Sequence, residues 1–138
     1  MALARIALIA LSLALLGATP APWPTDEPVR KGMLAIRDLV RINHSLVAHR
    51  RMPPDHAARF ARQVKVEADG ILATSRISGE ARETLRALLD EIVTGVGAVA
   101  ARDKAVSPID GLVRADEALA RYPQEFDHPG WGSLQSLD

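Results

Sequence analysis

Residues 27–54 read EPVRKGMLAIRDLVRINHSLVAHRRMPP, and the fold class follows from this stretch. Its apolar residues recur every three or four positions, which is the pattern of an amphipathic α-helix with one face turned to a core. The apolar stripe consists of Val29, Met33, Ile36, Val40 and Val47, widened by Leu39, Ile42 and Leu46. Because residues that precede proline avoid the helical conformation, we expect one helix from Glu27 to Arg51, ending before the proline pair at 53–54.

Three further helices are expected from similar local signals. Pro54 suits a first helical turn and opens a second helix that reaches about Ser75. Ser78 is the expected N-cap of a third helix, and residues 107–110 (Ser-Pro-Ile-Asp) combine a capping serine with a proline and an acid in the first turn of a fourth. The expected inward residues are Phe60, Val64, Ala68, Ile71, Leu85, Leu88, Leu89, Ile92, Val96, Val99, Ile109, Leu112, Leu119 and Tyr122.

These signals predict an all-α protein, an antiparallel up-down-up-down four-helix bundle over residues 27–127. No stretch shows sustained two-residue alternation of polar and apolar residues, so we expect no sheet. Pro123 should end or kink the fourth helix and leave a loose turn, followed by an irregular tail over 128–138. We interpret the glycines inside the helices as tolerated at exposed positions, with close helix approach or space for a ligand as the alternative. They are Gly32, Gly70, Gly95 and Gly97.

The N-terminal 21 residues have the layout of a secretory signal peptide. Arg5 precedes an apolar run of about a dozen residues, which is shorter than the roughly 20 that span a membrane, and small residues follow. We expect cleavage after Ala18 or Ala21, a periplasmic or secreted product, and no stable membrane insertion after processing. A proline-rich leader, residues 22–26, would then precede the helices.

The composition excludes several classes of function. The chain has 138 residues, 17 basic and 17 acidic side chains, and no cysteine. Disulfides, thiolate metal sites and covalent c-type haem are therefore excluded, and the zero net charge argues against nucleic-acid binding. No group of side chains has the spacing of a catalytic site. We expect a single domain without enzymatic activity or resident cofactor, as a monomer or weak dimer.

The first interhelical turn carries the strongest candidate for a binding site, a basic corner beside the single acid Asp55. Arg59 and Arg62 are three residues apart and share a helix face, and arginine binds carboxylate or phosphate through paired donors. We expect the corner to bind an acidic protein or an anionic small molecule, and a solvated helix face is the alternative. Its cations are Arg50, Arg51, Arg59, Arg62 and Lys65.

Two other groups of residues are candidates. His49 and His56 flank the same turn and could hold a divalent metal ion together with Asp55. At the other end, where the first helix starts and the fourth ends, aromatic rings should gather into a hydrophobic plug, with a ligand pocket as the alternative. These aromatic residues are Trp23, Tyr122, Phe126 and Trp131.

The C-terminal end carries a resemblance to a known family. Residues 120–131 read ARYPQEFDHPGW, and this ending on a signal-bearing four-helix pattern resembles small exported proteobacterial proteins labelled DnrO-like. The resemblance implies an exported helical protein and assigns no function. The cysteine-bearing segment of that family between the second and third helices is replaced here by residues 74–80, TSRISGE.

The expected architecture is also similar to cytochrome b562 and cytochrome c′. The covalent haem motif of the c′ type is absent, whereas the b562 type implies a methionine early in the first helix and a histidine near the end of the fourth. Met33 and His128 would be these ligands. Met33 lies about 9 Å inside its helix at 1.5 Å per residue, whereas His128 follows the fourth helix, which offsets the two along the axis. A b-type haem or a divalent metal is thus the alternative to an anion-binding module.

Overall fold

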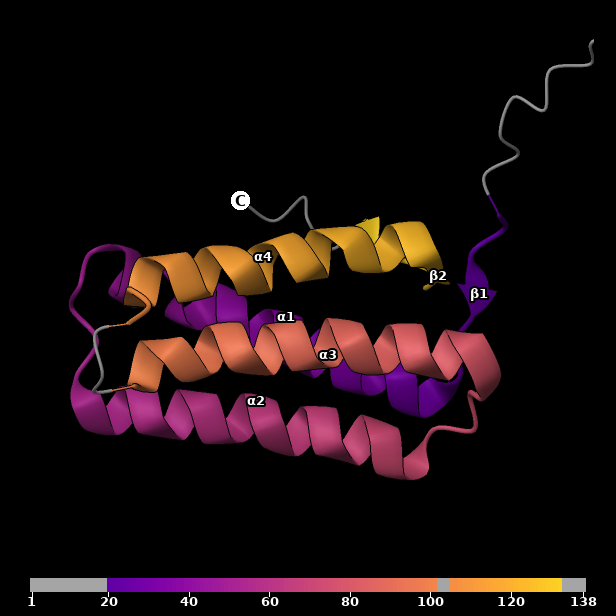
Figure 1. Ribbon diagram of the computed structural model, residues 1–138, viewed down its shortest axis with the longest axis horizontal. Coiled ribbons are helices and arrows are strands. Elements are labelled where there is room, and N and C mark those ends of the chain that lie inside the picture. Colours follow the sequence, from indigo (N-terminus) through magenta and orange to yellow (C-terminus); the bar gives the residue numbers. More distant parts are fainter. Residues whose placement is uncertain (1–19, 102–104, 133–138) are drawn as a thin grey trace, which may run out of the picture.

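The computed structural model describes residues 20–101 and 105–132, and these fold into four helices and one pair of very short strands (Figure 1). The all-α class and the number of helices are confirmed. Among the described helices, none combines the length and apolar character needed to cross a membrane. The predicted signal peptide falls almost entirely outside the described residues. The elements are β1 (Trp23–Pro24), α1 (Glu27–Ala48), α2 (Pro54–Thr74), α3 (Gly79–Ala100), α4 (Pro108–Glu125) and β2 (Phe126–Asp127).

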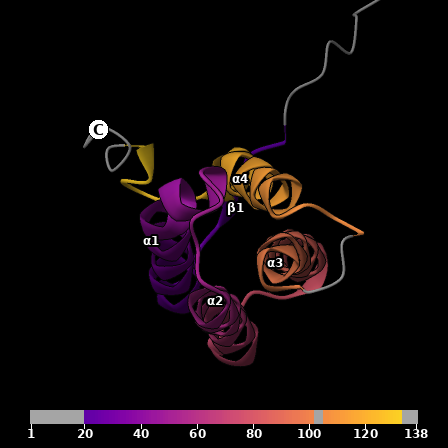
Figure 2. The ribbon, with the colours of Figure 1, turned by 90° about the vertical axis from the view of Figure 1, so that its left-hand side faces the viewer.

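The helices lie side by side, and each packs on its neighbours in the sequence, with α4 also contacting α1 (Figures 1 and 2). The α1–α2 turn, the end of α3 and the start of α4 lie together at one end of the molecule (Figure 1). We call this end the turn pole. The opposite end, which carries β1 and β2, is the strand pole.

An apolar core runs between the four helices. Most of the predicted inward residues are buried, although Ile109 at the start of α4 is only partly so. The predicted stripe of α1 is too wide, because Ile42 is 68% exposed and Leu39 and Leu46 are half-buried. The neighbouring helices cover one side of α1 and leave these residues at its margin. The fully buried residues include Val29, Met33, Ile36, Phe60, Val64, Leu85, Ile92, Val96, Tyr122 and Phe126.

Two of the interior glycines are sites of close helix approach, which makes the prediction of exposed positions wrong for them. A Cβ atom on Gly32 would overlap the side chain of Ile71 in α2, and one on Gly95 would overlap the carbonyl oxygen of Gly111 in α4. Gly70 and Gly97 do face open space. The α3–α4 contact therefore depends on glycine on both sides.

The strand pole contains a short parallel pairing that the sequence did not predict. Trp23 pairs with Phe126, and the next residue of each strand continues the register. The expected loose turn after Pro123 is also wrong, because α4 continues to Glu125 and the N–H of Phe126 donates to the carbonyl of Tyr122. Proline is tolerated so close to a helix end, since it removes only one backbone bond there.

Asp26 connects the start of α1 to the α2–α3 link. Its carboxylate accepts hydrogen bonds from the Val29 N–H at 3.2 Å, the Ser75 hydroxyl at 3.0 Å and the Arg76 N–H at 2.7 Å. Burial acts to raise the pKa of Asp26, but the hydrogen bonds from Arg76, Val29 and Ser75 outweigh it, and the pKa is lowered. The ionised carboxylate therefore favours the folded state.

We expect Asp26→Ala to lower the free energy of unfolding by about 1–3 kcal/mol at neutral pH, as for a lost N-cap with charge-assisted hydrogen bonds. A lowered pKa stabilises the fold above the unfolded-state value of 3.8, and this contribution is lost as the pH falls through the folded-state pKa. The difference between wild type and variant should thus shrink in acid. Urea unfolding at neutral and acidic pH measures it, with the exposed Asp90→Ala as the control. A difference that is constant with pH would contradict this role.

Candidate functional site

The structure distributes the predicted basic corner over separate places. Arg50 lines a cavity at the turn pole, whereas Arg59 and Arg62 line a groove between α1 and α2. Lys65 pairs with Asp69 at 2.6 Å on the exposed surface of α2. Arg51, exposed in the turn, lines neither of these two cavities, nor a hollow between α1 and α4, nor a fourth one lined by Asp90, Glu91, Thr94 and Arg114. The cavities thus place Arg50 apart from Arg59 and Arg62, and binding of an acidic partner by the five cations stays a prediction.

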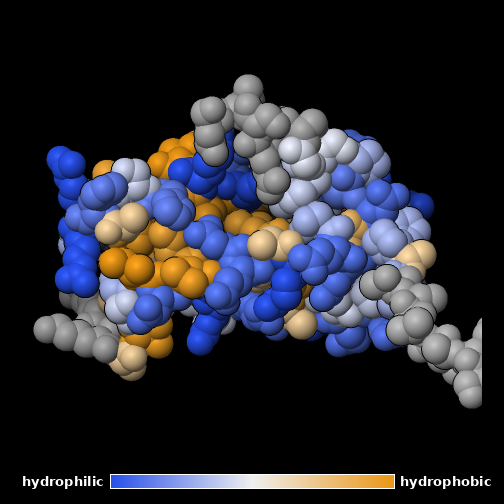
Figure 3. Space-filling view, turned by 90° about the horizontal axis from the view of Figure 1, so that it is seen from above, coloured by the Kyte–Doolittle hydropathy of each residue, from blue (hydrophilic) through white to orange (hydrophobic). Residues whose placement is uncertain are grey.

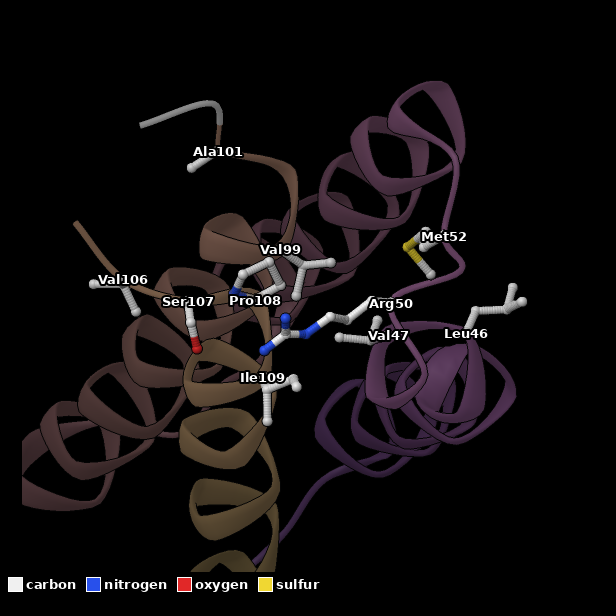
Figure 4. A pocket seen from close by; sticks show the side chains of 10 residues that line it. All are labelled: Leu46, Val47, Arg50, Met52, Val99, Ala101, Val106, Ser107, Pro108 and Ile109. Carbon is white, nitrogen blue, oxygen red and sulfur yellow. The ribbon is translucent and has the colours of Figure 1, made fainter. Parts of the chain in front are cut away.

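The turn-pole cavity has a volume of about 530 Å³ and predominantly apolar walls. On the face formed by α1 and α4, apolar surface gathers toward the turn pole, with hydrophilic residues around it (Figure 3). The guanidinium of Arg50 reaches from the α1–α2 turn into the middle of the cavity, toward Pro108 and Ile109 (Figure 4). The side chains that form the walls include Leu46, Val47, Met52, Val99, Val106 and Ile109.

The backbone of Arg50 has an unusual conformation. Its φ is 55°, and no other non-glycine residue in the described part of the chain has a positive φ. The Arg50 N–H donates to the Val47 carbonyl at 3.0 Å and the Arg51 N–H to the Leu46 carbonyl at 2.8 Å, which is the Schellman pattern that closes a helix. Glycine normally occupies this position, because the left-handed conformation costs other residues about 1–2 kcal/mol. The closure also ends α1 at Ala48, before the predicted end.

The left-handed backbone is accompanied by an Arg50 side chain that extends into the cavity (Figure 4). The guanidinium forms no hydrogen bond or ion pair with any described residue. The nearby Ser107 hydroxyl is occupied, since it accepts from the Asp110 N–H at 3.1 Å to cap α4. An unpaired cation beside apolar walls attracts an anion that also carries an apolar part. Backbone strain of this kind is concentrated at functional sites.

The two histidines of the predicted metal site have separate partners. The Nδ1 atom of His49 lies 2.9 Å from the Ser45 carbonyl oxygen, and the Nε2 atom of His56 lies 2.7 Å from Asn43 Oδ1. Within the described residues, no three His, Asp or Glu side chains are grouped closely enough to hold a metal ion. A metal site at these histidines stays a prediction.

The predicted aromatic plug forms at the strand pole. Ring centroids are 5.6 Å apart for Trp23 and Phe126, 5.5 Å for Tyr122 and Phe126, and 4.8 Å for Tyr122 and Trp131. The leader is tied to this cluster as well, because the Thr25 hydroxyl donates to the Asp127 carbonyl at 2.7 Å. Rings from the leader, from α4 and from the C-terminal segment therefore pack together and cover this end of the helical core.

The start of the predicted irregular tail belongs to this plug. His128 and Trp131 are 8% and 4% exposed, and Arg37 of α1 donates to the Trp131 carbonyl at 3.0 Å. The Arg37 guanidinium also lies 4.4 Å from the centroid of the Trp131 ring, a cation–π contact. The C-terminal segment is thereby held against α1 up to at least residue 131.

The haem alternative rests on Met33 and His128, which the structure places in packed surroundings. Met33 is fully buried, and His128 Nδ1 lies 2.9 Å from the Tyr122 hydroxyl. Burial, together with the charges of Arg30 and Arg37, lowers the pKa of His128. Neither Met33 nor His128 lines any of the four cavities described here. A haem at this pair stays a prediction.

A smaller hollow between α1 and α4 was not predicted. Its volume is about 290 Å³, and His44 Nε2 lies 3.3 Å from Asp116 Oδ2 at its wall. Partial burial raises the pKa of Asp116, and the neighbouring His44 acts against this shift. Both groups are about half exposed, and their contact lies at the wall of the hollow.

Comparison with protein-family models, with curated proteins and with solved structures finds no match for this chain. At the turn-pole cavity, apolar walls meet the guanidinium of Arg50, which points inward and has no partner among the described residues.

Proposed function

We propose that this protein is an exported antiparallel four-helix bundle that binds a small amphiphilic anion in the turn-pole cavity. The observation that carries the proposal is the guanidinium of Arg50, which has no partner among the described residues and points into a cavity of about 530 Å³ with mostly apolar lining residues. Export is supported by the signal-peptide pattern of residues 1–21. The bundle topology is supported by short links between successive helices that lie side by side.

The chemistry of the cavity defines the class of ligand. A carboxylate can accept paired hydrogen bonds from Arg50, and the N-terminus of α4 at the same cavity adds a favourable helix dipole. A small anion without an apolar part would pair with the guanidinium but would leave the apolar walls exposed to water. A neutral hydrocarbon would cover the walls but would remove water from the guanidinium without replacing the lost hydrogen bonds, which is unfavourable. The volume lies within the usual range of small-molecule sites, about 300–1,000 Å³. A carboxylate with a medium-length alkyl chain meets all of these requirements.

We expect octanoate to bind at least about tenfold more tightly than either octanol or acetate, because each control probe lacks one of the two interactions. Isothermal titration calorimetry with the three probes measures this preference. Arg50→Gly should weaken octanoate binding about 10- to 100-fold, the effect of losing a charge-assisted hydrogen bond.

The same variant separates binding from folding. Glycine adopts the left-handed backbone of position 50 without strain, so Arg50→Gly should unfold at nearly the wild-type urea concentration. Arg51→Ala removes the neighbouring cation, which lines none of the cavities, and should leave octanoate affinity unchanged. Equal binding of octanoate by wild type and Arg50→Gly would refute the proposed site.

A further inference from the structure

A second surface feature lies on another side of the molecule, between the outer faces of α1 and α2. This α1–α2 groove has a volume of about 630 Å³ and an apolar floor that includes Leu39. Ile42 on α1 and Val66 on α2 line it, and each is 68% exposed. The two helices lie opposite the α3–α4 contact (Figure 2), so the groove is separate from that packed side. Large apolar side chains gathered in one exposed groove mark an interaction surface.

Charged residues of both signs border the groove in equal number. Arg59 and Arg62 of α2 provide the cations, and Asp38 of α1 and Glu67 of α2 provide the anions. Neither arginine forms an ion pair with a described residue. Asp38 has only a 3.8 Å contact with Arg41, in which both side chains are more than half exposed. The border therefore has unused charge of each sign.

We propose that the α1–α2 groove binds the same groove of a second copy of this chain. A uniformly acidic partner would be repelled by Asp38 and Glu67, and a uniformly basic one by Arg59 and Arg62, whereas a copy carries both signs in matching places. The formal net charge of the chain is zero, so two copies do not repel each other at long range. This interface does not involve the turn-pole cavity and is independent of the proposed function.

The helix geometry gives the pairing of charges across the interface. At 1.5 Å per residue, Asp38 lies about 15 Å before the end of α1, and Arg62 lies about 12 Å after the start of α2. The two residues are thus at similar heights above the α1–α2 turn. A two-fold axis parallel to the helices places Asp38 of each copy against Arg62 of the other, because such contacts are reciprocal. The groove of one helix pair is a small interface, which implies a weak, concentration-dependent dimer.

Charge exchange provides the test, with association measured by sedimentation velocity from micromolar to millimolar protein. Wild type should dimerise as its concentration rises. Asp38→Arg and Arg62→Asp should each weaken self-association by at least about tenfold, because each creates two like-charge contacts. The double variant carrying both changes should recover association. An equimolar mixture of the two single variants should also associate, as a heterodimer with both pairs complementary.

Substitution of two exposed valines by aspartate locates the contact. Val66→Asp puts a charge into the groove and should abolish self-association, whereas Val113→Asp changes a 46% exposed valine on α4 and should not affect it. All substituted positions are exposed, and circular dichroism checks that the variants remain helical. Wild type that stays monomeric at every concentration would overturn the proposal. So would single charge variants that associate like wild type, or a double variant that does not recover.

Discussion

Gly95→Ala is expected to destabilise the protein by about 1–2 kcal/mol net, although alanine is the better helix former. The added methyl group would overlap the carbonyl oxygen of Gly111 and meet the backbone nitrogen of Ala115. These are backbone atoms of α4 and cannot rotate away, so α3 and α4 must move apart along their contact. Overpacking of a core costs about 1–3 kcal/mol or more, which exceeds the gain of about 1 kcal/mol in helix propensity.

Gly97→Ala is the matched control, two residues farther along the same helix. A Cβ atom at position 97 meets nothing within 4 Å, so only the helix propensity changes. This variant should gain about 0.5–1 kcal/mol. Urea unfolding of the two variants beside wild type measures both shifts, which should have opposite signs. Equal stabilisation by the two alanines would show that α3 and α4 do not approach each other at Gly95.

Tyr122→Ala is expected to cost about 3–5 kcal/mol, the range for truncating a buried aromatic side chain. Tyr122 is fully buried and packs against Phe126, Trp131 and His128, so its removal opens a cavity where the leader and the C-terminal segment meet α4. Tyr122→Phe keeps the ring and should cost only about 1–2 kcal/mol, through loss of the hydrogen bond to His128. The two variants separate packing from hydrogen bonding.

Equilibrium unfolding in urea measures these losses, and a double-mutant cycle with His128→Ala isolates the hydrogen bond. The change from tyrosine to phenylalanine should have a smaller effect when His128 is already absent, because the hydroxyl then has no imidazole partner. Octanoate affinity of the folded Tyr122→Phe variant should match wild type, since Tyr122 lines none of the four cavities. A Tyr122→Ala variant as stable as Tyr122→Phe would contradict the role of the plug.

The helices were predictable because their determinants are local. Ser107 caps α4 through the Asp110 N–H as expected, and α2 begins at Pro54 and ends at Thr74, one residue before the predicted end. The plug was also predictable, since aromatic residues cluster at the ends of the two helices that meet there. By contrast, the two-residue strand pairing joins Trp23 to Phe126, about a hundred residues apart in the sequence. Two residues are too few to show the alternating pattern by which a strand is predicted.

The candidate site was only partly predictable. The sequence predicts Arg50 as one of five cations near the turn. It does not show that, of these five, Arg50 is the one that lines the turn-pole cavity. The usual signal for a left-handed helix end is a glycine, and the chain has an arginine there. Arg59 and Arg62 line a different cavity, the α1–α2 groove.

The order of amino acids alone established an all-helical chain, the starts of its helices and most of its buried stripes, because periodicity and capping act within a few residues. It did not distinguish Gly95 from Gly97, which look alike in the sequence but are about 200° apart around the helix. The packing of α3 on α4 buries one and leaves the other open. Which glycine is indispensable and which arginine faces a cavity depend on how whole helices are rotated against one another, and that rotation arises from contacts between distant segments.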